Sequence, residues 1–181
     1  MFSLFFDGIQ QDLQIAILPP VLCALFRLLF IEIYRAKKSP LGEWRKWYHC
    51  FRYGFWWGMD LNAYFFLLLV LLVSLPGAFL PFYYSVGDTI RQVVVTMYAI
   101  AIYTAFLGKM IFYYHYHDIF NSTLWLGKKA EKHNLLDIFF HQDHGALLLL
   151  SYIPYTLLCW WAGKVFMLIP QLPYYHVSCL F

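Results

Sequence analysis

Charged residues are scarce in this sequence. Only 13% of its 181 residues are Asp, Glu, Lys or Arg, about half the share found in ordinary soluble domains, while 62% are hydrophobic and 22% aromatic. Such a chain has too few polar side chains to cover a water-exposed surface, which excludes an ordinary soluble domain. We therefore predict an all-α integral membrane helical bundle, with helices in the headgroup layer between its spans.

Signals for catalysis are also scarce. The four cysteines include no C-x-x-C pair, and no Ser, Thr or Cys stands in a nucleophile-elbow motif. The N-terminal MFSLFFDGIQQDLQ lacks the basic residues and the cleavage site of a signal peptide, so we expect it to belong to the mature protein. These residues predict no catalytic group and no cofactor in this chain.

Apolar stretches predict four transmembrane helices. A spanning helix takes about 20 apolar residues, so four spans and their loops use up the chain as a single transmembrane domain, 1–181. The clearest span contains an uncharged run from Leu61 to Pro81, and the least regular is interrupted by Pro19 and Pro20. The predicted spans are about 13–34, 55–80, 93–114 and 146–169.

Polar segments separate the predicted spans. Residues 35–52 carry six basic side chains and aromatic residues at helical spacing, which predicts an amphipathic helix in the headgroup layer. A second short interfacial helix is expected at Asn134-Leu-Leu-Asp137, which has the side chains of a helix N-terminus. The sequence PFYYSVGDTIRQ, between the second and third spans, is expected to be a connecting loop because it contains Pro, Gly and Asp.

The basic residues of the loops are distributed unevenly. Nine Lys and Arg lie on one side of the predicted membrane and one, Arg91, lies on the other. The positive-inside rule places both polar loops in the cytoplasm and both termini outside. Anionic phospholipid headgroups are the expected partners of these charges, and no nucleic acid is expected.

Two charged residues inside the spans are candidates for function. Arg27 and Asp60 each need a partner or a water-filled cavity at their depth, and they are candidates to pair with each other. With Asn62 and Tyr64 they could form a polar notch that grips a lipid headgroup, a neighbouring domain or partner helices. The alternative is a structural tie between helices, since buried pairs often serve only to orient them.

Histidines near the span ends suggest a further hypothesis. His115 and His117 close the third span, His141 and His144 open the fourth, and an aspartate accompanies each pair. Such side chains can bind zinc or iron, as in a histidine-liganded membrane metalloprotein. The alternative is that these residues hydrogen-bond to lipid headgroups.

One pattern of residues resembles a known family. Arg27-Leu-Leu-Phe30 lies in the first span, and Phe51-Arg-Tyr-Gly-Phe-Trp-Trp-Gly58-Met-Asp60-Leu-Asn-Ala-Tyr64 enters the second. This pattern resembles the membrane portion of lipoteichoic acid synthase-like phosphoglycerol transferases, members of the sulfatase and alkaline phosphatase superfamily. Asp118-Ile-Phe-Asn-Ser-Thr-Leu-Trp-Leu-Gly similarly resembles the stretch after the third helix of that family.

The resemblance implies a transmembrane anchor and lipid-positioning domain of a cell-envelope enzyme in a bacterial cell membrane. The family's extracytoplasmic catalytic domain, with its divalent metal and its nucleophilic threonine, is absent from this chain. The family usually has a fifth helix and places the loop after the third helix outside, whereas the charge distribution here places that loop inside. A small interaction or structural membrane protein is the alternative function.

Overall fold

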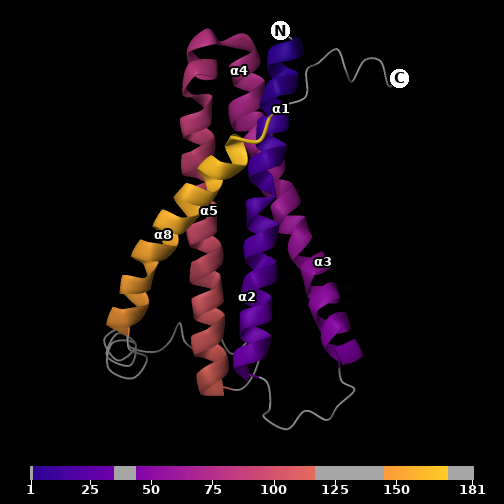
Figure 1. The fold of residues 1–181 in the computed structure, drawn as a ribbon, viewed down its shortest axis with the longest axis vertical. Helices are drawn as coiled ribbons and strands as arrows, with labels where there is room; N and C mark the ends of the chain where they lie inside the picture. The colour runs from indigo at the N-terminus through magenta and orange to yellow at the C-terminus, as the bar shows by residue number, and fades with distance from the viewer. Residues whose placement is uncertain (1, 35–43, 117–144, 171–181) are drawn as a thin grey trace, which may run out of the picture.

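The computed structural model describes residues 2–34, 44–116 and 145–170, which form a bundle of helices (Figure 1). Four of its helical segments are long and apolar enough to cross a membrane: Leu4–Tyr34, Met59–Phe79, Val86–His115 and Gly145–Met167. The prediction of an all-α bundle with four spans is confirmed, and no strand occurs within the described ranges. The elements are α1 (Phe2–Ala16), α2 (Leu18–Tyr34), α3 (Trp44–Leu69), η1 (Val70–Ser74), α4 (Leu75–Phe79), α5 (Pro81–Tyr116) and α8 (Gly145–Met167).

The first span is longer than its apolar pattern predicts. It was expected to begin near residue 13, but α1 already begins at Phe2, and its Asp12 is completely buried. The sequence pattern did not indicate this part of the helix because α1 contains polar residues. Some of these polar residues, such as Asp12, face the bundle interior and not water. Pro19 and Pro20 lie in the first turn of α2, where no intrahelical N–H donor is needed, so they begin a helix instead of breaking one.

Two further predictions about the connections are wrong. The segment PFYYSVGDTIRQ is not a loop but the first turns of α5, which Pro81 begins with a favourable fixed φ. The described part of the predicted interfacial helix, 44–52, is continuous with α3 and belongs to the same helix as the second span. Residues 35–43 and the expected helix at 134–137 lie outside the described residues.

A π-helical turn separates α3 from α4. The backbone N–H of Leu75 donates to the carbonyl of Val70, a wider turn than in an α-helix, and Pro76 follows without an N–H of its own. Proline disturbs the preceding turn of a helix, which accounts for the change of pitch here. The wider turn leaves both Val73 and Ser74 buried in the bundle.

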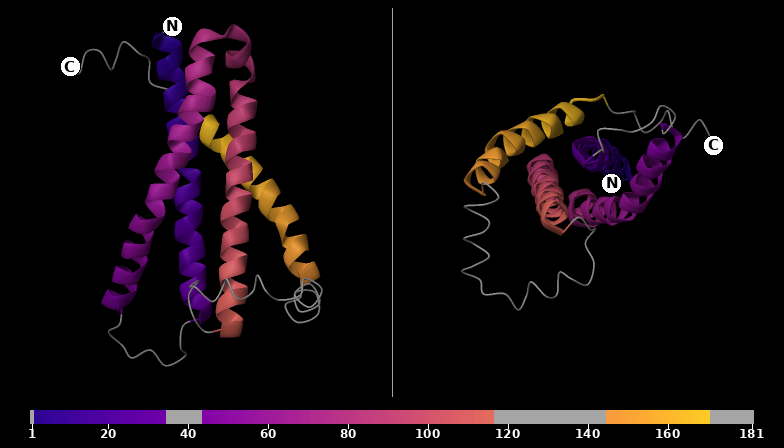
Figure 2. Two further views of the ribbon diagram at one scale, coloured as in Figure 1. Left: turned by 180° about the vertical axis from the view of Figure 1, so that it is seen from behind. Right: turned by 90° about the horizontal axis from the view of Figure 1, so that it is seen from below.

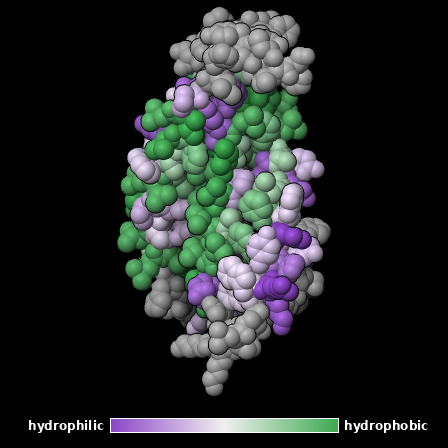
Figure 3. Space-filling view, turned by 45° about the vertical axis from the view of Figure 1, so that its right-hand side comes forward, coloured by the Kyte–Doolittle hydropathy of each residue, from purple (hydrophilic) through white to green (hydrophobic). Residues whose placement is uncertain are grey.

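The helices converge at one end of the bundle and diverge at the other. Figures 1 and 2 show α1, α4 and the beginning of α5 together at one end, while α3 and α8 splay outward toward the opposite end. Large apolar side chains cover much of the outer surface, as Figure 3 shows for one face. A surface of this kind suits contact with lipid chains. The buried core contains Ile15, Leu18, Leu22, Phe65, Leu69, Val95, Ala99 and Cys159.

Polar contacts hold α8 against α5. The Tyr155 hydroxyl donates to the carbonyl of Ala99 at 2.9 Å, and the Gln92 side-chain amide donates to the carbonyl of Trp160 at 2.7 Å. Gly163 makes this approach possible, because a Cβ there would lie only 2.6 Å from Gln92 Nε2. Interhelical hydrogen bonds and small residues of this kind are typical of membrane bundles.

Candidate functional site

A buried ionic cluster joins three elements near the convergent end. Arg91 Nε on α5 donates to Asp12 Oδ1 on α1 at 2.6 Å, and Ser74 Oγ on η1 donates to Asp12 Oδ2 at 2.5 Å. Arg91 Nη2 lies 3.1 Å from Ser74 Oγ. Both oxygens of the buried carboxylate therefore accept a hydrogen bond, which a charge in a low-dielectric interior requires.

Small residues bring the backbones close enough to form this cluster. The Gly8 carbonyl accepts a bond from Arg91 Nη2 at 3.4 Å, and a Cβ at Gly8 would lie 2.8 Å from Ser74 Oγ. The adjoining cavity measures about 10 Å³, which is room for about one water molecule. A cluster packed this tightly ties helices together and leaves no space for a larger ligand.

Sequence reasoning missed this cluster. Arg91 was counted as the one basic residue of an outer loop, but its side chain is buried inside the bundle. Two signals could have revealed it: Gly8 and Asp12 lie four residues apart on one helix face, and Asp88 and Arg91 lie three apart on another. Neither signal identifies its partner, because Asp12 and Arg91 are 79 residues apart in the sequence.

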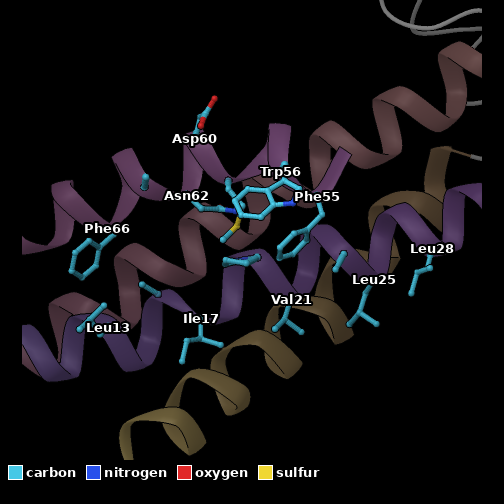
Figure 4. Close-up of a pocket in the computed structure, with 15 residues that line it drawn as sticks. Leu13, Ile17, Val21, Leu25, Leu28, Phe55, Trp56, Asp60, Asn62 and Phe66 are labelled. Atoms are coloured by element: carbon cyan, nitrogen blue, oxygen red, sulfur yellow. The ribbon is translucent and has the colours of Figure 1, made fainter. Parts of the chain in front are cut away.

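The considered pairing of Arg27 with Asp60 is not found. Asp60 is exposed and projects away from α2 in Figure 4, and no ion pair joins it to Arg27 within the described part of the chain. The reason is helical geometry, since residues two apart lie about 200° apart around the axis. Asn62 faces the interior and accepts a bond from the Tyr98 hydroxyl at 3.1 Å, so Asp60 faces outward.

The four residues of the predicted notch are therefore dispersed. Asn62 is buried, Tyr64 is 71% exposed on the outer surface, and Arg27 lines a different pocket from Asp60. Asp60 and Asn62 do line one cavity together, although their side chains point in different directions. Three of the four residues thus line two neighbouring hollows, and Tyr64 lines neither of them.

The first hollow is an apolar groove between α2 and α3. Its volume is about 720 Å³, and it opens onto the outer surface of the bundle (Figure 4). Aliphatic side chains line it from the end of α1 and from α2, and aromatic side chains line it from α3, with Asp60 and Asn62 as its polar members. The lining residues include Leu13, Ile17, Val21, Leu25, Leu28, Phe55, Trp56, Ala63 and Phe66.

The second hollow lies among α2, α3 and α5 and contains two cations. It measures about 400 Å³, and both Arg27 and Lys109 line it. Lys109 Nζ stands 4.4 Å from the centroid of the Phe30 ring, a cation–π contact. Its remaining walls include Cys23, Phe26, Phe55, Leu61, Tyr98, Ile102 and Phe106. The sequence alone does not predict that Lys109 lies beside Arg27, because the two residues are 82 positions apart on different helices.

The histidine hypothesis stays a prediction. His115 lies exposed in the last described turn of α5, whereas His117, His141 and His144 lie outside the described residues. Within residues 2–34, 44–116 and 145–170, no group of His, Cys, Asp and Glu side chains could hold a metal ion.

The described side chains offer binding surfaces more than reactive groups. The closed ionic cluster can join helices. The open apolar groove can accept hydrocarbon, and the cation-lined pocket can attract an anion. No protein-family model, curated protein or solved structure shows significant similarity to the chain.

Proposed function

We propose that this chain is the membrane anchor and lipid-positioning domain of a phosphoglycerol transferase-like cell-envelope enzyme, whose catalytic domain lies outside this sequence. The observation that carries the proposal is the apolar groove between α2 and α3, which opens sideways out of the bundle. Its volume is within the range of sites that hold small organic ligands. In a membrane, the molecules that meet such an opening are lipids.

The groove suits a lipid with a hydroxyl-bearing headgroup. Its walls are almost wholly apolar, so an acyl chain is its natural occupant. Asp60 stands beside Met59, where the membrane-spanning part of this helix begins, and is therefore at headgroup depth. Its exposed carboxylate can accept hydrogen bonds from headgroup hydroxyls. The groove would then hold the acyl chain and Asp60 would hold the headgroup, which together would fix the position of the lipid.

The family resemblance supports the enzymatic part of the proposal. Arg27, Gly58 and Asp60 stand where the related membrane domains have Arg, Gly and Asp. On this proposal the protein resides in a bacterial cell membrane and acts on phosphoglycerol lipids through a domain beyond these residues.

The first test is the mass of the native polypeptide. An antibody against residues 115–144 is used on membranes of the native cells after denaturing electrophoresis. A band much larger than the 21.6 kDa of this chain is expected, since the catalytic domain must be added. A band at 21.6 kDa, with no partner enzyme co-purifying, would contradict the proposal.

The second test fills the groove. Ala63→Trp places a large ring in the groove lining, and Leu67→Trp places the same ring on the exposed surface of the same helix, outside the lining. We expect Ala63→Trp to reduce crosslinking of a photoactivatable phosphoglycerol lipid by about tenfold, because the ring takes the space of the acyl chain. Leu67→Trp should crosslink as the unmodified chain does, and equal loss in both variants would argue against a specific groove.

A structural role is the second candidate, and the closed ionic cluster favours it. Asp12, Ser74 and Arg91 bind one another with no space for a ligand, so this part of the chain serves assembly of the bundle. If that were the whole function, groove variants would leave lipid binding unchanged, and only variants of the cluster would alter folding or association with partner helices.

A further inference from the structure

The two ends of the apolar groove lie at different heights along the bundle. One wall runs along α1 and α2 from Leu13 to Leu28, and the other runs along α3 from Phe66 to Phe55. At a rise of 1.5 Å per residue, the walls are about 22 Å and about 16 Å long. Figure 4 shows Leu13 and Phe66 on one side of the view and Leu28 on the other. Since α2 ends and α3 begins at the divergent end of the bundle, Leu28 and Phe55 mark the outer end of the groove, nearer to that end.

The inner end of the groove, at Leu13 and Phe66, lies within one leaflet. The candidate span of α3 begins at Met59, so Phe66 lies seven residues, or about 10 Å, inside that boundary. One leaflet contributes about 15 Å to the hydrocarbon core of a bilayer. Beyond this point α1 packs against α3, and Ile15 and Leu69 are fully buried in the core. The groove therefore ends before the middle of the bilayer.

Side chains that can bind a headgroup lie near the outer end. Trp56 and Asp60 line the groove one turn apart on α3, and both are exposed. An indole N–H can donate to a phosphate or ester oxygen, and a carboxylate can accept from a glycerol hydroxyl. Asn62, the polar lining residue farther in, is buried and already accepts a bond from the Tyr98 hydroxyl. The groove thus offers polar groups to one end of an amphiphile and hydrocarbon to the other.

A lipid of the opposite leaflet does not fit this arrangement. Its headgroup would have to lie beside Leu13 and Phe66, whose side chains cannot form hydrogen bonds. Polar groups that leave water without gaining such bonds lose several kcal/mol, about 2 or more. Its acyl chain would end beside the Asp60 carboxylate, where hydrocarbon gains nothing.

We infer that the groove takes a phosphoglycerol lipid from one leaflet only, the leaflet at the divergent end. The headgroup lies at Trp56 and Asp60, and the acyl chain ends between Leu13 and Phe66. This inference rests on the proposed function for the identity of the lipid, and it adds the orientation and the leaflet. An enzyme domain that acts on the bound headgroup must then lie at the divergent end.

The first test maps where the two ends of one lipid lie. Two phosphatidylglycerols carry a photoactivatable diazirine, one beside the ester of an acyl chain and the other at its methyl end. Each is incorporated with the full chain into proteoliposomes, and mass spectrometry of proteolytic fragments locates the label. The ester-end probe should label residues 55–60, and the methyl-end probe should label Leu13 and Phe66. We expect the ratio of label at the two ends to differ by about fivefold or more between the probes, because these ends lie about 16 Å apart. Equal ratios, or the reverse order, would overturn the inference.

The second test identifies the leaflet that supplies the lipid. The methyl-end probe is introduced into the outer leaflet alone by cyclodextrin exchange, and the vesicles are illuminated at once. In a chain whose four native cysteines are alanine, Trp44→Cys reports the divergent end, and an impermeant biotin maleimide captures the chains that expose it outside. The captured chains should carry the groove label and the remaining chains should lack it. Equal labelling of both fractions would overturn the inference.

A pair of matched variants tests the headgroup end. Trp56→Leu with Asp60→Leu removes an aromatic and a charge from the groove mouth, and the two probes should then give similar ratios. Arg52→Leu with Tyr53→Leu removes an exposed charge and an exposed aromatic from the same helix outside the lining, and the ratios should stay different. Different ratios kept in the first variant would contradict the role of Trp56 and Asp60.

Failure of this inference can be told from failure of the proposed function. If both probes label the groove at both ends alike, and Ala63→Trp removes that label, the groove binds lipid but does not orient it. If neither probe labels the groove at all, the proposed function itself is wrong.

Discussion

Asp12 and Arg91 show how a charge can be stable inside the bundle. Asp12 is fully buried, yet each of its oxygens accepts a bond, one from Arg91 and one from Ser74. Asp88 binds the same guanidinium at 3.1 Å, but 63% of its side chain is exposed. Water can take the place of Asp88 beside the Arg91 guanidinium, but water has little access to Asp12.

Asp12→Asn should therefore destabilise the protein far more than Asp88→Asn. The first variant removes the buried counter-charge of the guanidinium and leaves only the exposed Asp88, and loss of one partner of a buried pair costs about 3 kcal/mol. The second removes an exposed pair, typically worth less than about 1 kcal/mol. The free energy of unfolding in detergent, followed by circular dichroism during titration with SDS, measures both. Equal losses would mean that Asp12 is not the principal partner of Arg91.

Prediction from sequence was limited at this scale by side-chain direction. Arg27 and Asp60 could be recognised as charges inside spans, but whether they met depended on the rotation of α2 and α3 about their axes. That rotation turns Asn62 inward and Asp60 outward. Lys109 lies near the end of its span, and its position beside Arg27 depends on how α5 packs against α2.

Helix packing depends on a close approach between α5 and α8. The side-chain amide of Gln92 fits against Gly163 and donates to the carbonyl of Trp160. Gly77 in α4 provides a natural comparison, because a Cβ there would meet no atom within 4 Å.

Gly163→Ala should loosen α8, whereas Gly77→Ala should not. The added methyl displaces the Gln92 amide and breaks its bond to Trp160, a loss of about 1 kcal/mol. Alanine at 77 costs nothing in packing and improves helix propensity by up to about 1 kcal/mol. Hydrogen exchange of α8 amides reports the difference, with faster exchange expected only in the Gly163 variant. Unchanged exchange would show that Gln92 can move aside freely.

At the scale of elements the apolar spans could be predicted, but their beginnings could not. Uninterrupted hydrophobic runs locate α8 and the second half of α3, since they need no partner to be recognised. The polar start of α1 and the loop-like start of α5 are helical for a reason that local sequence does not contain. Asp12 and Arg91 satisfy each other across the bundle, which makes two polar segments suitable for its interior.

The whole molecule has a marked charge asymmetry. Burial of Arg91 removes the one basic residue assigned to the opposite loop, so the loop cations all belong to the end where 35–43 and 117–144 connect the described helices. This strengthens the expectation that the divergent end faces the cytoplasm. It also increases the difference from the family that the sequence resembles, whose loop after the third helix lies outside.

Cysteine labelling would resolve this orientation. With Cys23, Cys50, Cys159 and Cys179 replaced by alanine, Leu80→Cys places a thiol at the α4–α5 turn and Trp44→Cys places one at the start of α3. A membrane-impermeant maleimide added to intact cells should label Leu80→Cys only, because the basic end is retained inside. After permeabilisation both should react. The reverse pattern in intact cells would favour the family topology.

The ionic tie between α1 and α5 also has a consequence for biosynthesis. Asp12 leaves the ribosome 79 residues before Arg91. At 5–20 residues per second, this is an interval of about 4 to 16 s in which the carboxylate has no counter-ion from its own chain. The first span, which contains α1 and α2, therefore cannot reach its final arrangement when it is made. The earliest helix therefore gains its buried counter-charge only when α5 is made, and insertion of α5 completes the ionic tie between them.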